Sequence, residues 1–441
     1  MADGTATIAR LEAELATTPR ATRPYEHALV AHRLGLAYAE TPGADADDRL
    51  RRALACFDLA SSLLEPAFHP LEHARVLTAA GSVRRSLGEP DAALRLFTSA
   101  AEIAATRVTA DEAAAMVNNI GLALLGTGAL DDAVERFSEA IELFDAAGAE
   151  GRRGRASALH NRGLARAASG AVSDLLRAVA DYDEALATVA YDEASLHHGL
   201  VHHSRGVAAV ALCERDAPPG AAHWRTTAIE VFGQALDIFV WPEHRVHHAI
   251  ASFNLGRTWV GAGTDESLRR GVLHLEDAVT AFDPRSQSGP WRQAYDALLA
   301  AESELAQRHP GQRRPDHLVA LLHDAGPDEA QRLLRRRLTR WFVLPAPARD
   351  SLLRDLVTAA VVAGEGSGTG ALVLMLSSAV ELPVEAQAAV LDAFLSVRRS
   401  LDDDGREVID GLVDRAVGEA VVGPQRVFVR DHLVAGGFER P

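Results

Sequence analysis

Apolar residues recur every three or four positions along residues 116–144, and polar residues fill the positions between them. This spacing is typical of amphipathic helices. We expect two helices, because Gly126, Thr127 and Gly128 interrupt the pattern. Asp131 follows the interruption, where an acidic side chain favours a helix N-terminus. The segment is therefore predicted to be a helical hairpin with one apolar face left uncovered.

The same frame of residues occurs six times between residues 24 and 283. A glycine in the first helix is followed in the second helix by a small residue, a bulky residue and another small residue. The six glycines stand forty to fifty residues apart, at Gly35, Gly81, Gly121, Gly163, Gly206 and Gly256. A helical hairpin repeated at such a period indicates an α-solenoid, in which neighbouring copies bury one another's apolar faces.

The frame resembles the tetratricopeptide repeat (TPR). The runs Asn118-Asn119-Ile120-Gly121 and His160-Asn161-Arg162-Gly163 are similar to the first-helix motifs of that family. The period is longer than the family's usual length of roughly 34 residues. The resemblance implies an all-α, right-handed TPR-type α-solenoid of about six helical hairpins. It also implies a binding scaffold, because most members of the family are scaffolds.

Four segments are expected along the chain. Residues 1–23 are predicted to be a leader helix, 24–308 the TPR solenoid with a capping helix, 309–315 a linker and 316–441 a C-terminal α-helical domain. The repeat frame is lost in the last segment, but the helical spacing continues through seven expected helices. An arginine run at 332–340 has two interpretations, a solvated helix face or a surface that docks onto the acidic solenoid.

The composition narrows the functional classes. The net charge is −16, which argues against nucleic-acid binding. No run approaches the roughly eighteen or more apolar residues of a membrane span, and the N-terminal stretch lacks the apolar core of a signal peptide. The two cysteines fall in different repeats, so a disulfide framework is not implied and a cytoplasmic location is expected. The chain contains no lysine, which is typical of a high-GC genome.

In a TPR protein the first helix of each hairpin lines the concave groove. The positions near each repeat glycine carry imidazoles and amides, which can hydrogen-bond a peptide backbone, beside an apolar stripe. We therefore expect a protein or peptide partner, unless the C-terminal helices cover the groove. The predicted groove residues are His32, Asn118, Asn119, His160, Asn161, Arg162, His203, Arg205, Asn254 and Arg257.

Two of these residues break the local pattern. Arg162 and Arg205 stand just before the repeat glycine, where other repeats carry an apolar residue, and a charge in a core needs a partner. Asp181 is the predicted partner of Arg162, whereas the equivalent residue of the fifth repeat is Val231. Arg205 is therefore a candidate for binding an anion. This supports an alternative function, a small-molecule-binding or enzymatic protein that uses a His/Arg patch in repeats four to six.

Histidine is enriched in two short runs. His198 and His202 are four residues apart, as are His244 and His248, and each pair on one helix face can hold a divalent metal. The alternative is a packing role, because long-period TPRs often place an aromatic residue eight positions before the glycine. That position holds His27, His73, His198 and His248. No HExxH, CxxC or Rossmann motif occurs, so no other cofactor is expected and catalysis stays an open question.

Overall fold

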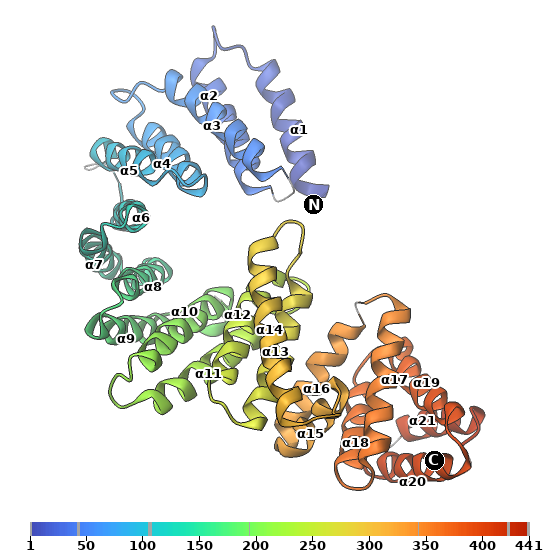
Figure 1. The fold of residues 1–441 in the computed structure, drawn as a ribbon. Helices are drawn as coiled ribbons and strands as arrows, with labels where there is room; N and C mark the ends of the chain where they lie inside the picture. Colours follow the sequence, from blue (N-terminus) through green and yellow to red (C-terminus); the bar gives the residue numbers. More distant parts are fainter. Residues whose placement is uncertain are drawn as a thin grey trace. The chain divides into compact units, whose positions relative to one another are not determined.

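The computed structural model describes residues 2–41, 45–104, 108–193, 195–342, 344–420 and 424–438. Within these ranges the secondary structure consists of helices α1 to α21 and a 3₁₀ turn at Tyr191–Glu193, without strands (Figure 1). The chain divides into two compact units, unit 1 at Met1–Ile238 and unit 2 at Phe239–Pro441. The all-α prediction is confirmed. No helix in the described ranges combines the length and the apolar character that membrane crossing requires.

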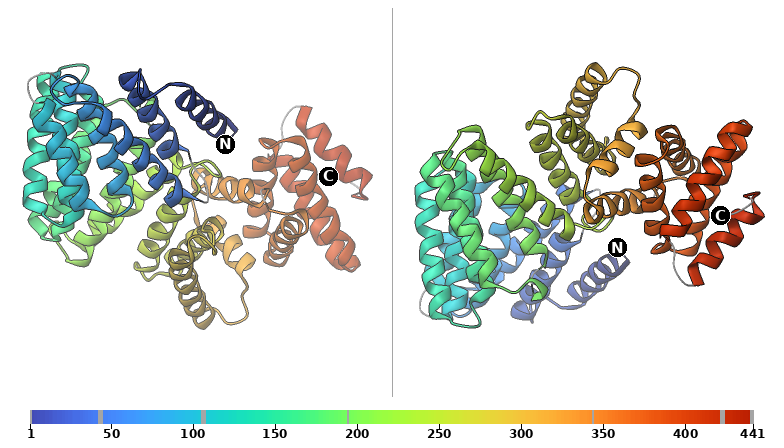
Figure 2. Two further views of the ribbon diagram at one scale, coloured as in Figure 1. Left: turned by 90° about the horizontal axis from the view of Figure 1, so that it is seen from above. Right: turned by 90° about the horizontal axis from the view of Figure 1, so that it is seen from below.

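Unit 1 consists of a leader helix and five hairpins. The two helices of each hairpin pack together, and each hairpin also packs on the next, as Figure 2 shows for α2 to α11. The first helices α2, α4, α6, α8 and α10 also contact one another in sequence, so they form one continuous face. The helices are α1 (Ala2–Thr17), α2 (Pro24–Glu40), α3 (Ala46–Leu63), α4 (Pro70–Ser86), α5 (Pro90–Ala104), α6 (Ala110–Thr127), α7 (Leu130–Ala146), α8 (Arg152–Ser169), α9 (Val172–Thr188), α10 (Ser195–Glu214) and α11 (Ala221–Ile238).

Local sequence sets the ends of these helices. Proline occupies the first turn of α2 and α4, where its missing N–H costs nothing. Thr109 and Glu112 form a capping box at the start of α6, in which each side chain accepts a hydrogen bond from the backbone of the other residue. Gly128 ends α6 with φ = 82°, a left-handed conformation that glycine adopts without strain. The predicted break at residues 126–128 is therefore a helix C-terminus.

The repeat frame is a set of contacts between a glycine and an aromatic ring. A Cβ atom added to Gly121 would lie 2.6 Å from the Cε1 atom of Phe137, so only a hydrogen fits between the two helices. Phe137 itself is completely buried. The same contact, at 2.5–2.7 Å, occurs at Gly35 with Phe57, Gly81 with Phe97, Gly163 with Tyr182 and Gly206 with Phe232. The predicted alignment of the repeats is therefore confirmed in unit 1.

Unit 2 begins with the sixth hairpin, α12 (Arg245–Val260) and α13 (Asp265–Ala281). The predicted capping helix is α14 (Ser288–Arg308), which packs on α13. The seven expected C-terminal helices are present as α15 (Arg314–Asp324), α16 (Pro327–Trp341), α17 (Ala346–Ala363), α18 (Ser367–Val380), α19 (Val384–Ser400), α20 (Asp403–Ala420) and α21 (Pro424–Ala435). They share one hydrophobic core, which also includes Leu273 of α13. The predicted linker lies inside this unit, between α14 and α15, so a domain boundary there stays a prediction.

The arginine run on α16 contributes to packing within unit 2. Arg337 forms ion pairs with Glu276 and with Asp277 of α13, the latter at 3.2 Å. Arg340 pairs with Asp277 and donates a hydrogen bond to its backbone oxygen at 2.6 Å. Both arginines are buried, and burial lowers the pKa of Arg340 to about 10. Of the two interpretations of this run, docking onto the solenoid hairpin therefore holds for Arg337 and Arg340, whereas Arg335 pairs with Glu381 at the surface.

Candidate functional site

Hydrogen bonds join neighbouring first helices at the predicted groove positions. Asn161 of α8 donates from Nδ2 to Oδ1 of Asn118 on α6 at 3.0 Å. His160 of α8 forms a 2.9 Å hydrogen bond through Nε2 with the hydroxyl of Ser204 on α10. In each bond the residue three positions before one glycine meets the residue two positions before the next glycine. These side chains therefore satisfy one another and tie α6, α8 and α10 together.

The predicted His/Arg patch contains charges that are already matched. Asp181, which is 3% exposed, accepts hydrogen bonds from both Arg162, at 2.7 Å, and Arg166, at 2.6 Å. This confirms the predicted partner of Arg162. Arg205 of α10 forms an ion pair at 2.8 Å with Asp183, which lies on α9 together with Asp181. The arginines of the patch are therefore neutralised by α9, which weakens the argument for a bound anion.

The histidines of the patch are packed among rings. His160 lies edge-on to Tyr182 and to His197, with ring centroids 5.8 and 5.5 Å apart. Burial, and then the neighbouring His197 and His203, lower the pKa of His160 to about 4. His203 packs against Phe232 of α11, with ring centroids 5.7 Å apart. The imidazole of His160 is therefore uncharged at neutral pH, and it contributes packing and one hydrogen bond.

The pKa of His160 predicts an acid-sensitive fold. Between pH 6.5 and 4 the unfolded chain binds a proton at this position and the folded chain does not, so stability falls as the pH falls. One such histidine lowers the free energy of unfolding by up to about 3 kcal/mol at pH 4. In urea titrations at several pH values, His160→Gln should therefore reduce this loss, because glutamine keeps a hydrogen-bonding group and does not titrate. The exposed His223→Gln is the control and should leave the loss unchanged. Equal losses in both variants would contradict the assignment.

The histidines proposed as metal ligands have structural roles. His198 donates a hydrogen bond to the backbone oxygen of Val189 at 2.9 Å, and His248 donates to Phe239 at 2.8 Å. In both bonds the accepting residue lies nine residues before the histidine, directly after the end of the preceding helix. His27 and His73 make the same bond to Thr18 and Leu64. The packing interpretation of this position therefore explains all four histidines. No group of three or more metal-binding side chains occurs among the residues described.

His202 and His244, the other halves of the predicted pairs, add little to a metal site. The ring of His202 lies 6.4 Å from that of His198 between centroids. Burial lowers the pKa of His202 to about 4, and His198 and Arg205 contribute to the shift. His244 precedes α12 and packs against Phe239, with ring centroids 6.3 Å apart. The last two predicted groove residues, Asn254 and Arg257, lie on α12 in unit 2. The guanidinium of Arg257 stacks over the ring of Phe253.

A hollow of about 360 Å³ opens on the face of α2, α4 and α6. It includes two predicted groove residues, His32 and Asn119. The remaining lining residues are Leu36, Leu71, Arg75, Thr78, Ala79, Val108, Glu112, Ala115 and Met116. A second hollow, of about 530 Å³, lies between α1 and α2 and shares Leu36 with the first. Both hollows therefore lie within α1 to α6, upstream of the His/Arg patch.

The lining of the first hollow is largely uncharged and includes one ion pair. Arg75 of α4 pairs with Glu112 of α6 at 3.0 Å, and both side chains reach solvent. The pKa of His32 is lowered by burial and by the charge of Arg75, so His32 is neutral near pH 7. The pKa of Glu112 is lowered, first by its hydrogen bond from the backbone of Thr109, so Glu112 is ionised. This arrangement accepts a ligand without net charge more readily than an anion.

Asn119 lines this hollow. Its neighbours at the equivalent groove positions, Asn161 and Ser204, are hydrogen-bonded between helices. The side-chain amide of Asn119 has no such partner in the part of the chain that the structure describes, because the hydroxyl of Thr78, at the matching position of α4, donates to the backbone oxygen of Ala74 instead. It can therefore donate to and accept from a bound backbone amide. Asn119 is the polar group most suited to hold a ligand in this groove.

Solved structures that resemble this chain contain helical repeats. The Rap conjugation gene regulator of the plasmid pLS20, in complex with a Phr peptide, is 15% identical, with coverage of 65% of this chain and 79% of that chain and a TM-score of 0.39. The TPR2AB domain of yeast Sti1 in a pHSP90 complex is 14% identical, with coverage of 63% and 99% and a TM-score of 0.23. Yeast Tom70 is 11% identical, with coverage of 93% and 96% and a TM-score of 0.22.

These similarities concern the type of fold alone. No protein-family model matches the sequence, and no curated protein matches it either. The glycine–aromatic packing of five successive hairpins identifies the repeats from their own geometry. The chain is a TPR-type α-solenoid, continued by further helices.

Proposed function

We propose that this protein is a non-catalytic TPR scaffold, and that the groove of unit 1 captures an extended peptide segment of a partner protein. The observation that carries the proposal is the hollow on α2, α4 and α6, in which the free amide of Asn119 lies among apolar side chains. Leu36 and Met116 can contact apolar side chains of such a segment, while Asn119 hydrogen-bonds its backbone. The cytoplasmic location expected from the sequence remains a prediction.

The extent of the groove supports a peptide over a small molecule at this face. The two hollows of unit 1 meet at Leu36, so a ligand that fills both must run from α1 across α2 and α4 to α6. An extended chain advances about 3.3 Å per residue, so several residues are needed to cross three helices. The ion pair of Arg75 and Glu112 adds no net charge at the edge of the first hollow, and Arg33 at the second hollow is paired with Glu14. We therefore propose a segment with little net charge and with spaced apolar residues.

The alternative function has less support. A bound anion in the His/Arg patch would compete with Asp181 and Asp183, which already pair with Arg162, Arg166 and Arg205. Breaking a partly buried ion pair costs stability, so the binding free energy of an anion would be reduced by that amount. A metal at His198 would likewise have to displace its bond to Val189. The hollow upstream, in contrast, can take a ligand without breaking an ion pair of this kind.

Ala79→Arg tests the peptide proposal. The substitution places a long side chain across the hollow, and arginine is a good helix former, so α4 should stay folded. Peptides are first selected on the wild-type protein from a random displayed library, and their affinity is then measured by fluorescence anisotropy. We expect the variant to bind the selected peptides at least about tenfold more weakly, a loss of about 1.4 kcal/mol.

The matched control is Ala55→Arg, which adds the same charge and volume at an exposed position of α3, a second helix. This control should bind the peptides like the wild type. The proposal is wrong if the library yields no binder, or if the two variants bind the selected peptides equally well.

A further inference from the structure

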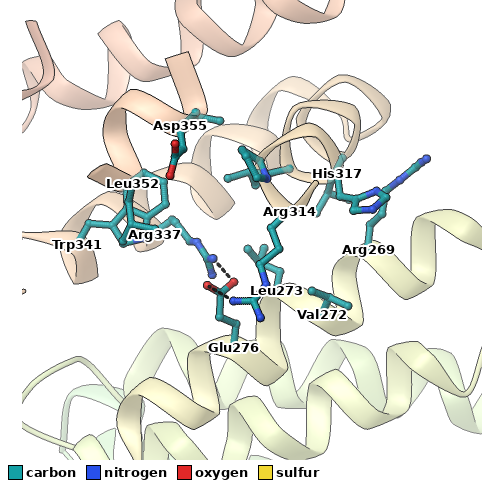
Figure 3. Close-up of a pocket in the computed structure, with 14 residues that line it drawn as sticks. Arg269, Val272, Leu273, Glu276, Arg314, His317, Arg337, Trp341, Leu352 and Asp355 are labelled. Carbon is teal, nitrogen blue, oxygen red and sulfur yellow. Dashed lines mark hydrogen bonds and ion pairs between the residues drawn. The ribbon is translucent and has the colours of Figure 1, made fainter. Parts of the chain in front are cut away.

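Unit 2 contains a hollow of about 300 Å³ that is lined only by its own helices, α13, α15, α16 and α17 (Figure 3). Ligand pockets of this size hold small molecules. Most of the lining is apolar, with Val272 and Leu273 on α13, Leu318 and Leu321 on α15, and Leu352 and Leu356 on α17. An occupant therefore needs a hydrocarbon body to replace water on these walls.

Charged side chains surround the same hollow. Arg337 forms an ion pair with Glu276, and Arg314 lies 3.9 Å from the same carboxylate (Figure 3). Arg269 lies beside His317 at another part of the wall, and its guanidinium is 3.4 Å from Asp324. Three guanidinium groups thus line a pocket whose own carboxylates are Glu276 and Asp355. Each of these guanidinium groups also has a carboxylate partner at the wall or behind it, because Arg314 pairs with Glu302 and Arg337 pairs with Asp277 as well as with Glu276.

Three buried side-chain nitrogen atoms around the hollow have no hydrogen-bond partner in the described part of the chain. The Nε atoms of Arg269 and Arg337 are N–H donors without a hydrogen-bond partner in the described part of the chain. Nδ1 of His317 also lacks a hydrogen-bond partner among the described residues, and His317 is only 9% exposed. Burial and the charge of Arg269 lower the pKa of His317, so its ring is neutral and one nitrogen carries a proton. Buried donors are normally satisfied, so the two arginine Nε–H groups leave the pocket short of acceptor atoms.

We propose that this hollow is a binding site for a small organic acid with an apolar body and one carboxylate. The carboxylate supplies two acceptor oxygens to the guanidinium of Arg269 and the imidazole of His317, and the body packs on the leucines. A carboxylate brings one negative charge to the wall that holds Arg269 and His317, whereas a phosphate would bring a second charge toward Glu276. The site is independent of the peptide groove, because it uses no residue of unit 1.

Calorimetric titration of the full chain with three defined probes tests the site. The probes are 3-phenylpropionate, its neutral analogue 3-phenylpropanol, and L-phenylalanine, which adds an ammonium group to the acid. We expect saturable binding of the acid and at least about tenfold weaker binding of the alcohol. The proposal is overturned if the acid does not bind at millimolar concentration, or if the acid and the alcohol bind equally.

Variants then locate the site. Leu352→Trp fills the hollow and should abolish acid binding, and Arg269→Gln should weaken it at least about tenfold while leaving alcohol binding unchanged. The control Arg292→Gln removes an exposed arginine of α14 and should have no effect, as should Ala79→Arg in unit 1. Melting curves establish that each variant is folded. If Leu352→Trp does not fold, Arg269→Gln decides, and equal affinity of Arg269→Gln and Arg292→Gln for the acid overturns the proposal.

The third probe distinguishes two sources of the ligand. Asp355 lies on the wall opposite His317 and Arg269 in Figure 3, where it could pair with an ammonium group. Tighter binding of phenylalanine than of 3-phenylpropionate, lost in Asp355→Asn, assigns the site to an apolar amino acid. Weaker binding of phenylalanine assigns it to a simple carboxylic acid. Both results retain the proposed carboxylate site.

Discussion

Replacing Gly121 by leucine is expected to lower the free energy of unfolding by more than about 3 kcal/mol, the upper end of the cost of overpacking a core. The Cβ atom alone would lie 2.6 Å from the ring of Phe137, and the ring cannot withdraw because it is completely buried. The helices α6 and α7 would have to separate, and α5 and α8 pack against them. Urea titration followed by circular dichroism measures the loss.

Alanine substitutions give the matched comparison. Gly121→Ala should still destabilise the protein, by about 1–3 kcal/mol, because its methyl group already overlaps Phe137. Gly233 also lies inside a helix, α11, but a Cβ there meets nothing within 4 Å. Gly233→Ala should therefore stabilise the chain, by up to about 1 kcal/mol. The repeat alignment is contradicted if both glycines respond to alanine in the same direction.

Removing the carboxylate of Asp181 is the second substitution for which a large loss is expected. Asp181 is 3% exposed and holds the guanidinium groups of Arg162 and Arg166, which are 17% and 21% exposed. Asp181→Ala leaves both cations without this partner in a largely buried setting, and such changes cost about 3–5 kcal/mol. The midpoint of urea unfolding should fall accordingly.

The control for this substitution is Asp183→Ala, on the same helix. Asp183 is 51% exposed and pairs with Arg205, so its removal should cost no more than about 1 kcal/mol. A triple variant, Asp181→Leu with Arg162→Leu and Arg166→Met, should recover most of the stability, because apolar side chains replace the whole buried network. If Asp181→Ala and Asp183→Ala cost the same, the buried network does not have the energetic role assigned to it.

The hairpins could be predicted from the sequence because their determinants are local. The spacing of Gly121 from Phe137 reflects a contact between consecutive helices, so the same spacing in other repeats identified the same contact. The pairing of Arg162 with Asp181 also followed from one hairpin. In contrast, the arginine run of α16 could be read as solvated or buried, because its partners Glu276 and Asp277 lie about sixty residues upstream.

The candidate site was only partly predictable. His32 and Asn119 were identified from their distance to the repeat glycine, but Arg75, Glu112 and Met116 were not. These three lie one or two turns closer to the helix N-terminus on the same face, so extending the pattern by three residues would have included Arg75 and Met116, and by seven residues Glu112. The position of the hollow was not predictable, because it depends on how far α2, α4 and α6 stand apart. The packing role considered for His198 and His248 did not include their bonds to backbone oxygens, because the repeat pattern does not show which atoms end the preceding helix.

The most direct test of the central claim is the position of a selected peptide on unit 1. Peptides carrying a photoreactive diazirine residue are bound to the full chain, irradiated, and the cross-linked residues are identified by mass spectrometry. We predict cross-links to the lining of the hollow, such as Leu36, Thr78 and Met116 on α2, α4 and α6, and their loss in Ala79→Arg. Cross-links concentrated on the second helices α3, α5 and α7, or confined to unit 2, would contradict the claim that this groove binds a peptide.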